Sequence, residues 1–258
     1  EFMGLVLALP LLLLARAIRP LVLVRFGRLP TNRIGMLAGW PEVYLSERES
    51  LSKSTRTLDL VYLDPFVCNR QLTNMWRRRM HVVPMSRLLE RLNRLIPGGR
   101  PHIGLQRISP IEGGPDAGRQ AMFFDRRRNL QKVFASTQPH VRFTKSELQT
   151  GCYRLEDLGI PAGAPFMCFH VRDPAYLETV ANTHQSPRST HQSRDTLGAS
   201  WQPHGYRDAS VHDYLPAAEA MTARGYYAIR MGAAVRESMA VDNPMTIDYA
   251  STARSDFM

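Results

Sequence analysis

The sequence PFMCFHVRDP at residues 165–174 contains a short, mostly apolar run with a proline at each end. A run of this length between such boundaries is typical of a buried strand in a parallel sheet rather than of a helix. Strand-like and helix-like patterns alternate elsewhere in the chain, which indicates parallel sheets that helices cover on both faces. The sequence therefore predicts an α/β fold.

Polar groups stand at the end of this predicted strand, at His170, Arg172 and Asp173. Open α/β sheets place their ligands at the carboxyl ends of their strands. Arg172 suits a phosphate or a carboxylate there, because a guanidinium can donate two charge-assisted hydrogen bonds at once. The same residues are equally consistent with an ion pair between Arg172 and Asp173 that only braces the strand end.

The composition favours an anionic partner. The 258 residues include 33 Lys and Arg against 23 Asp and Glu, a net charge of +10 that suits nucleotide diphosphates, nucleic acid or an acidic membrane. A hydrophobic content of 44% excludes global disorder, and the length allows one large or two small domains. The three cysteines and eight histidines show no disulfide framework and no metal-ligand spacing. We therefore expect no metal site and a reducing, cytoplasmic location.

An apolar segment occupies residues 4–20, where the run 4–15 is interrupted by Pro10 and followed by Arg16 and Arg19. About a dozen apolar residues are fewer than the roughly 20 that span a bilayer. The segment also lacks the basic start and cleavage site of a secretory signal. Two interpretations remain open: a helix on a membrane surface, with its arginines near the headgroups, or a buried first helix.

A first domain is predicted at residues 21–159. Strands are expected at 21–26, 58–63 and 81–83, and helices from about Arg33, over 71–80, and over 86–96 with Ser86 as its N-cap. Thr144 and Glu147 form a capping box for a last helix that ends at Gly159. That helix is expected to turn four residues inward: Leu148, Cys152, Leu155 and Leu158.

A second domain is predicted at residues 160–258, because residues 160–165 hold two prolines and a glycine and mark a boundary. Beyond the central strand we expect a long loop at 177–205, a helix from Asp213 to about Arg224, and strands at 226–231 and 244–249. Three strands are fewer than the usual five or six of a doubly wound domain. The second domain is therefore expected to be incomplete.

Four blocks of the sequence resemble a group of bacterial glycosyltransferases associated with surface-carbohydrate synthesis. They are residues 25–35 with 42–45, residues 159–173, residues 206–232 and residues 243–258. The pair His170-x-Arg172 is also distantly similar to the His-x-Arg-x-x-Asp motif of O-fucosyltransferases and of bacterial chitin-oligosaccharide fucosyltransferases. Here Ala175 occupies the position of that motif's aspartate, while Asp173 lies earlier.

The resemblance implies a transferase of two Rossmann-like domains (GT-B-like), with the acceptor on the first and the nucleotide sugar mainly on the second. It implies that an arginine contacts the donor diphosphate without a metal or other cofactor, and we expect Arg172 in that role with Arg230 as second choice. The partners would be a nucleotide-sugar donor and a carbohydrate or lipid-linked acceptor. Members of the group continue past Met258, so this chain is expected to be inactive alone.

Transfer of a sugar also requires a base for the acceptor hydroxyl and a surface for the acceptor. Asp173 and His170 are the candidate bases, although His170 could equally be a core histidine. Arg28, Asn32 and Arg33 lie on the first strand-to-helix turn, where they could face the cleft or could cap the helix and brace the turn.

The alternative is a non-catalytic basic protein that binds RNA or an acidic membrane. The arginine runs at 77–79 and 126–128 lack the interleaved aromatic residues of nucleic-acid sites, so no nucleic-acid partner is expected. A dinucleotide-dependent oxidoreductase is excluded because no G-x-G-x-x-G follows the first strand. A protein kinase is excluded because the companions of His170-Val171-Arg172-Asp173 are missing. The expected location is cytoplasmic, with peripheral attachment to the inner membrane left open.

Overall fold

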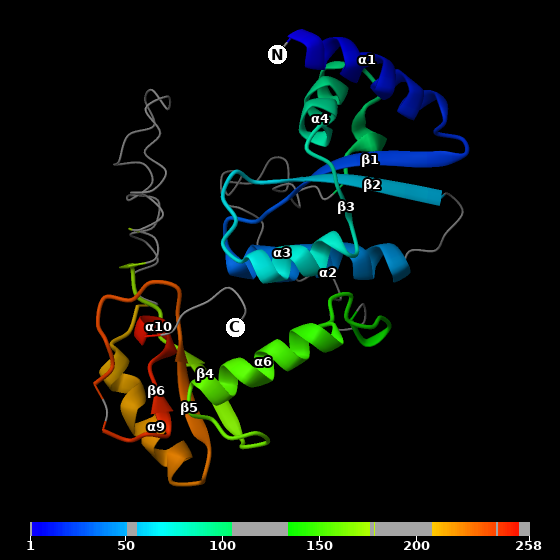
Figure 1. Cartoon of the computed structure of the whole chain (residues 1–258). Helices are drawn as coiled ribbons and strands as arrows, with labels where there is room; N and C mark the ends of the chain where they lie inside the picture. The colour runs from blue at the N-terminus through cyan, green and yellow to red at the C-terminus, as the bar shows by residue number, and fades with distance from the viewer. Residues whose placement is uncertain are drawn as a thin grey trace. The chain divides into compact units, whose positions relative to one another are not determined.

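The computed structural model describes residues 2–50, 56–104, 134–175, 178, 208–240 and 242–252. The chain forms two compact units, Glu1–Phe143 and Thr144–Met258. Each unit contains a three-stranded parallel sheet with helices packed against it (Figure 1). The predicted α/β class is therefore confirmed, and the units are described separately below.

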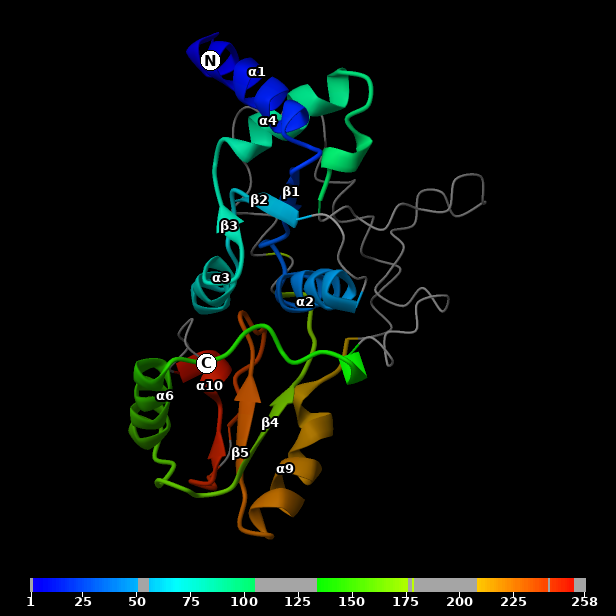
Figure 2. The ribbon, with the colours of Figure 1, turned by 90° about the vertical axis from the view of Figure 1, so that its right-hand side faces the viewer.

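The first unit contains a sheet of order β1-β2-β3 in which both strand pairs are parallel. A parallel bridge between Phe26 and Ile103 adds a further contact to β1. Helices α1 and α4 lie on one side of the sheet, and α2 and α3 lie on the other (Figures 1 and 2). The elements are α1 (Phe2–Ala17), β1 (Val22–Leu29), α2 (Ile34–Ser50), β2 (Arg56–Leu63), α3 (Arg70–Arg77), β3 (His81–Val82), α4 (Ser86–Leu95) and the 3-10 turn η1 (Arg100–His102).

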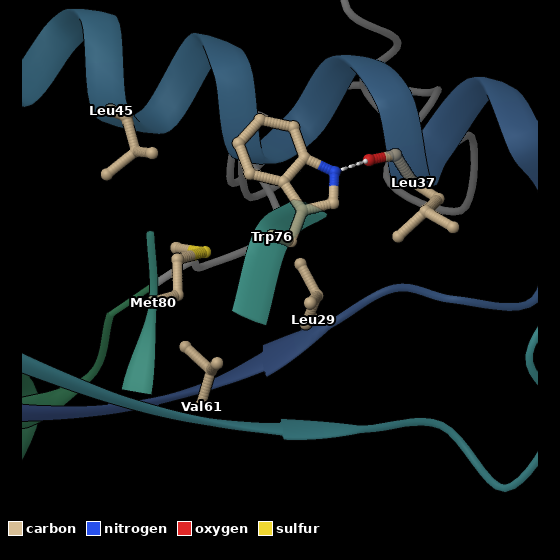
Figure 3. Packing of buried hydrophobic residues seen from close by; sticks show 6 residues of the cluster. All are labelled: Leu29, Leu37, Leu45, Val61, Trp76 and Met80. Carbon is tan, nitrogen blue, oxygen red and sulfur yellow. Dashed lines mark hydrogen bonds between the residues drawn. The ribbon is translucent and has the colours of Figure 1, made fainter. Parts of the chain in front are cut away.

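A tryptophan lies at the centre of the core between the sheet and helices α2 and α3. The indole of Trp76 is fully buried, and its Nε1 donates a hydrogen bond of 2.8 Å to the carbonyl oxygen of Leu37 (Figure 3). That carbonyl lacks its usual partner in α2, because the residue four positions later is Pro41, which has no N–H. The indole therefore supplies the donor that the proline removes.

The opposite core joins α1 and α4 to the sheet. Ala8, Leu12 and Ala15 of α1 are buried against Val24, Phe26 and Leu89, so the buried-helix interpretation is confirmed for this side of α1. The end of α1 is fixed by Arg16, whose guanidinium donates to Asn93 Oδ1 and to the carbonyls of Ile96 and Pro97, just after α4. In the part of the chain that the structure describes, no helix is long and apolar enough to cross a membrane.

The second unit contains a sheet of order β4-β5-β6, again parallel throughout. One face packs around Ile160, Ile229 and Tyr249, and another cluster forms around Val171, Val211 and Met239. The elements are α6 (Lys145–Asp157), β4 (Phe166–His170), η3 (Val211–Tyr214), α9 (Leu215–Thr222), β5 (Tyr227–Met231), β6 (Thr246–Ile247) and α10 (Tyr249–Thr252).

The helix α6 differs from its prediction in two respects. It belongs to the second unit rather than to residues 21–159, because Leu155 and Leu158 near its end pack against Ile160 and Ile229. The core reaches only that end of the helix, so Leu148 and Cys152 are exposed instead of buried. The capping box of Thr144 and Glu147 is confirmed, with both reciprocal hydrogen bonds present.

Two predicted helix caps are wrong. Ser86 is the first residue of α4 rather than its N-cap, and its hydroxyl donates to the carbonyl of Val83 instead. In the second unit Ser210 forms a capping box with Asp213 and starts the turn η3, and α9 begins only at Leu215. This arrangement leaves Pro216 in the first turn of α9, where a missing N–H has no cost. Most of the predicted loop at 177–205 and the run 126–128 lie outside the described residues.

Candidate active site

The carboxyl edge of the second sheet is held together by two aspartates. Asp173 follows β4, and its carboxylate accepts the backbone N–H of Ala175 at 2.8 Å and that of Arg236 at 3.1 Å. Asp248 follows β6 and accepts the backbone N–H of Met239 at 2.6 Å. Both Arg236 and Met239 belong to the loop after β5, the central strand. The two outer strands therefore fix the loop of the strand between them.

Arg172 lies at this edge with its guanidinium partly exposed. Its Nε is 3.3 Å from Oδ1 of Asp208, and the two side chains are 30% and 29% exposed. Its carbonyl oxygen accepts the backbone N–H of Ala209, which keeps the Asp208 segment beside it. Among the described residues, Asp208 is the carboxylate that Arg172 contacts, so the predicted ion pair with Asp173 does not form. No other side-chain contact of this guanidinium is formed with the described residues, so among them its Nη side can offer two parallel hydrogen bonds to an anion.

His170, the last residue of β4, is exposed. Its register partner is Met231, which packs in the cluster of Ile160 and Ile229 on the α6 face of the sheet. No hydrogen bond joins the imidazole to another described residue. His170 is therefore not a core histidine, and it remains accessible for proton transfer.

Arg230 has a different environment from the one predicted for it. It lies within β5, is 1% exposed, and donates from Nη1 to the carbonyl of Glu237 at 2.7 Å. The same nitrogen is 3.4 Å from Oδ2 of Asp248. A diphosphate would have to enter the core to reach this guanidinium. The burial therefore favours a role for Arg230 in fixing the loop after β5 rather than in donor binding.

The turn after β1 in the first unit is also internally bonded. Arg28 pairs with Asp64 through two contacts, Nε to Oδ1 at 2.5 Å and Nη2 to Oδ2 at 3.0 Å. The same carboxylate accepts the backbone N–H of Thr31 at 3.1 Å. Asn32 and Arg33 are half-buried in the turn that leads into α2. These contacts support the bracing role for Arg28, although its side chain is still 41% exposed.

An open groove of about 540 Å³ lies beside the end of β2 and the outer face of α3. Its apolar lining residues are Leu63, Pro65, Phe66 and Val67. The helix contributes Arg70, Thr73, Asn74 and Arg77, and the exposed residues 70, 74 and 77 share one face of α3. This groove was not among the sites predicted from the sequence. The helical spacing of its polar residues was the available signal.

A second cluster of charges in the first unit is structural. Asp59, 6% exposed, accepts hydrogen bonds from Arg25 at 2.8 Å and from the Tyr44 hydroxyl at 2.7 Å, and it also contacts Arg48. Burial lowers the pKa of Arg25, but the hydrogen bonds and charges of Asp59 and Tyr44 together outweigh burial and leave that pKa raised. Burial and the neighbouring Asp59 carboxylate also raise the pKa of Tyr44. Arg25 therefore stays charged and Tyr44 stays neutral, and neither is prepared for proton transfer.

The described ranges contain no group of three or more His, Cys, Asp or Glu side chains that could hold a metal ion. The absence of a metal from the mechanism remains a prediction. Cys68, Cys152 and Cys168 are free thiols, and burial raises the pKa of Cys168.

Comparison of the chain with family models, with curated proteins and with solved structures finds no match in any of the three. The resemblance to glycosyltransferases therefore remains a hypothesis. The assignment of chemistry to the carboxyl edge of the second sheet rests on its own residues, Arg172, Asp208 and His170 above all.

Proposed function

We propose that this chain is a glycosyltransferase that moves a sugar from a nucleotide-sugar donor to a surface-polysaccharide or glycolipid acceptor. The observation that carries the proposal is the environment of Arg172. Its guanidinium is partly exposed at the carboxyl edge of a parallel sheet, and Asp208 engages only the Nε side. That position is where α/β proteins bind nucleotides, and the free side of the fork matches a diphosphate.

The reaction assigns one role to each accessible group. The bond between the anomeric carbon and the diphosphate oxygen breaks, and Arg172 stabilises the charge that develops on the departing diphosphate. The acceptor hydroxyl oxygen bonds to the anomeric carbon, and its proton passes to a base. His170 is the favoured base, because both carboxylate oxygens of Asp173 already accept backbone N–H groups. No metal or other cofactor is assigned a role.

The architecture proposed for this activity is GT-B-like, with a Rossmann-like domain in each unit. In support, the bridge of Ile103 to β1 extends the first sheet to the order β3-β2-β1-Ile103, which is the arrangement of the first strands of a Rossmann sheet. The groove beside α3 is the proposed acceptor site. Its arginines Arg70 and Arg77 suit an anionic acceptor, and its apolar lining suits a sugar face or a lipid link.

The proposed location is the cytoplasm, with peripheral attachment to the inner membrane where lipid-linked acceptors are found. The second candidate is a non-catalytic basic protein that binds an acidic membrane, and the exposed leucines of α1 favour it.

Binding of RNA is less well supported. Within the run 77–79, Arg78 and Arg79 donate to the backbone carbonyls of Arg142 and His140, so two of the three arginines are engaged internally.

Saturation-transfer NMR on the chain separates these candidates, because it detects weak ligands. The probes are nucleoside monophosphates, nucleoside diphosphates, nucleotide sugars and a single-stranded RNA oligonucleotide. The proposal predicts saturable transfer to nucleotide sugars and competition by the matching nucleoside diphosphate, but not by the monophosphate. Binding of RNA alone, or equal binding of monophosphates and diphosphates, would contradict it.

A further inference from the structure

Helix α1 has an exposed side made of leucines. Its buried residues Ala8, Leu12 and Ala15 lie on one side, at positions i, i+4 and i+7. Among the side chains of α1 that the structure describes, four leucines are solvent-exposed by 44% to 57% and form what we call the leucine face: Leu9, Leu11, Leu13 and Leu14. A surface helix of a soluble domain normally carries polar residues on that side. Packing in the core of the first unit therefore explains why the buried side of α1 is apolar, but it does not explain the leucine face.

Two further leucines and several arginines surround this face. Arg16 ties the end of α1 to the end of α4, where Leu95 is 79% exposed, and Leu21 just after α1 is 75% exposed. We call the exposed arginines just after α1 and on α4 the arginine rim: Arg19, Arg87 and Arg91. Arg94 of α4 is exposed too, but it is paired with Glu90 and is not counted in the rim. Residues 2–41 contain five arginines and no acidic residue. Two of the five, Arg25 and Arg28, are paired with Asp59 and Asp64 of the same unit, so the surplus positive charge rests on the others.

We propose that the leucine face binds an anionic phospholipid surface, with the arginine rim against the lipid headgroups. An interfacial helix combines an apolar face with nearby basic residues in this way. At 16 residues, α1 is about 24 Å long, shorter than the roughly 30 Å of a bilayer core, and its other side is committed to the protein core. The helix therefore lies along the membrane surface rather than across it.

The charges argue against a second copy of the chain as the occupant of this face. In a two-fold dimer the same patch meets itself, so one arginine rim would face another. Like charges brought together at an interface are unfavourable, whereas anionic headgroups compensate each arginine by about 1 kcal/mol. The inference does not depend on the proposed glycosyl transfer, because it rests on burial and charge in the first unit alone.

Flotation of the chain with phospholipid vesicles tests the leucine face. The vesicles contain phosphatidylcholine alone or phosphatidylcholine with phosphatidylglycerol. The double variant Leu9→Ser/Leu13→Ser should partition to the mixed vesicles about a hundredfold more weakly than the unmodified chain, about tenfold for each leucine. The matched control is Leu148→Ser on α6, a leucine that is 55% exposed and outside the face, and it should partition normally. Equal losses in variant and control, or no loss in either, would overturn the proposal.

The double variant Arg19→Gln/Arg91→Gln tests the arginine rim. Partition to the mixed vesicles should fall about fivefold for each arginine, while the weak partition to phosphatidylcholine alone stays unchanged. Circular dichroism of each variant confirms that the fold is retained. Light scattering tests whether a second copy of the chain occupies the leucine face instead. If the leucine variants convert a dimer to a monomer and leave vesicle binding unchanged, the face is a self-association surface and the proposal is wrong.

Discussion

Arg172 and Asp208 form a one-sided ion pair, in which only the guanidinium Nε faces the carboxylate, at 3.3 Å from Oδ1. Both side chains are about one-third exposed, so solvent screens the pair and its contribution to stability is small. The ion pair instead determines how the Arg172 guanidinium is oriented. Asp208 holds the guanidinium by one edge and leaves the other edge for a ligand.

Asp208 is therefore expected to act as a positioning residue. Asp208→Asn keeps an oxygen that can accept from Nε, and its affinity for a nucleoside diphosphate should stay within about threefold of the unmodified chain. Asp208→Ala removes that oxygen, and affinity should fall about tenfold, or roughly 1.4 kcal/mol, because nothing then orients the guanidinium. NMR titration measures both. Equal effects of the two variants would show that Asp208 does not orient Arg172.

The pairing of Trp76 with the carbonyl of Leu37 predicts coupling to Pro41. Trp76→Phe leaves that carbonyl buried without a donor and should destabilise the first unit by about 3 kcal/mol, part of it from lost volume. Pro41→Ala restores a helical N–H at the right position. The double variant should therefore recover about 1 kcal/mol relative to Trp76→Phe alone. Urea unfolding followed by circular dichroism measures the cycle, and strictly additive effects would contradict it.

The Asp59 cluster predicts a large loss of stability from a single change. Asp59→Ala removes the carboxylate that pairs with Arg25 and Arg48 and leaves Arg25 part-buried without its partner. Breaking a buried pair in this way costs about 3–5 kcal/mol. Glu49→Ala, at a carboxylate that is 60% exposed, is the control and should change stability by about 1 kcal/mol at most. Urea unfolding followed by the fluorescence of Trp40 and Trp76 measures both variants. A loss for Asp59→Ala no larger than the loss for Glu49→Ala would show that the cluster is dispensable.

Cys168 is exposed as a whole residue, but the partial desolvation of its thiol raises the pKa of that thiol, so its thiolate should form only at higher pH than that of an ordinary cysteine. In a Cys68→Ser/Cys152→Ser variant, the alkylation rate of Cys168 by iodoacetamide should still be rising at a pH where the rate of a free cysteine has levelled off. The reference reaction is N-acetylcysteine under the same conditions. A plateau of Cys168 at or below the reference pH would contradict the assigned environment.

Local patterns in the sequence predicted the fold well. The strands at 58–63 and 166–171 and the capping box of Thr144 and Glu147 depend on neighbouring residues, and they were found close to their predicted positions. The predicted burial of Leu148 in α6 was wrong, because amphipathic spacing shows which side of a helix is apolar but not how far along the helix the core extends.

The candidate site was harder to predict, because its contacts join distant segments. Arg172 pairs with Asp208, 36 positions later, and not with adjacent Asp173. Arg230 is enclosed by Asp248 and the carbonyl of Glu237, which only the sheet order brings together. A pattern of residue types at strand ends identified the correct edge of the sheet. It could not indicate which charged groups face outward and which are used to hold the loops.

The central claim is that Arg172 holds the donor diphosphate, and an NMR titration of matched arginine variants tests it most directly. Arg172→Ala is compared with Arg224→Ala, an exposed arginine at the end of α9 that lies outside the candidate site. Using the nucleotide sugar that binds best to the unmodified chain, affinity should fall by about ten- to a hundredfold for Arg172→Ala. It should be unchanged for Arg224→Ala. Unchanged affinity in Arg172→Ala, or an equal loss in both variants, would contradict the claim.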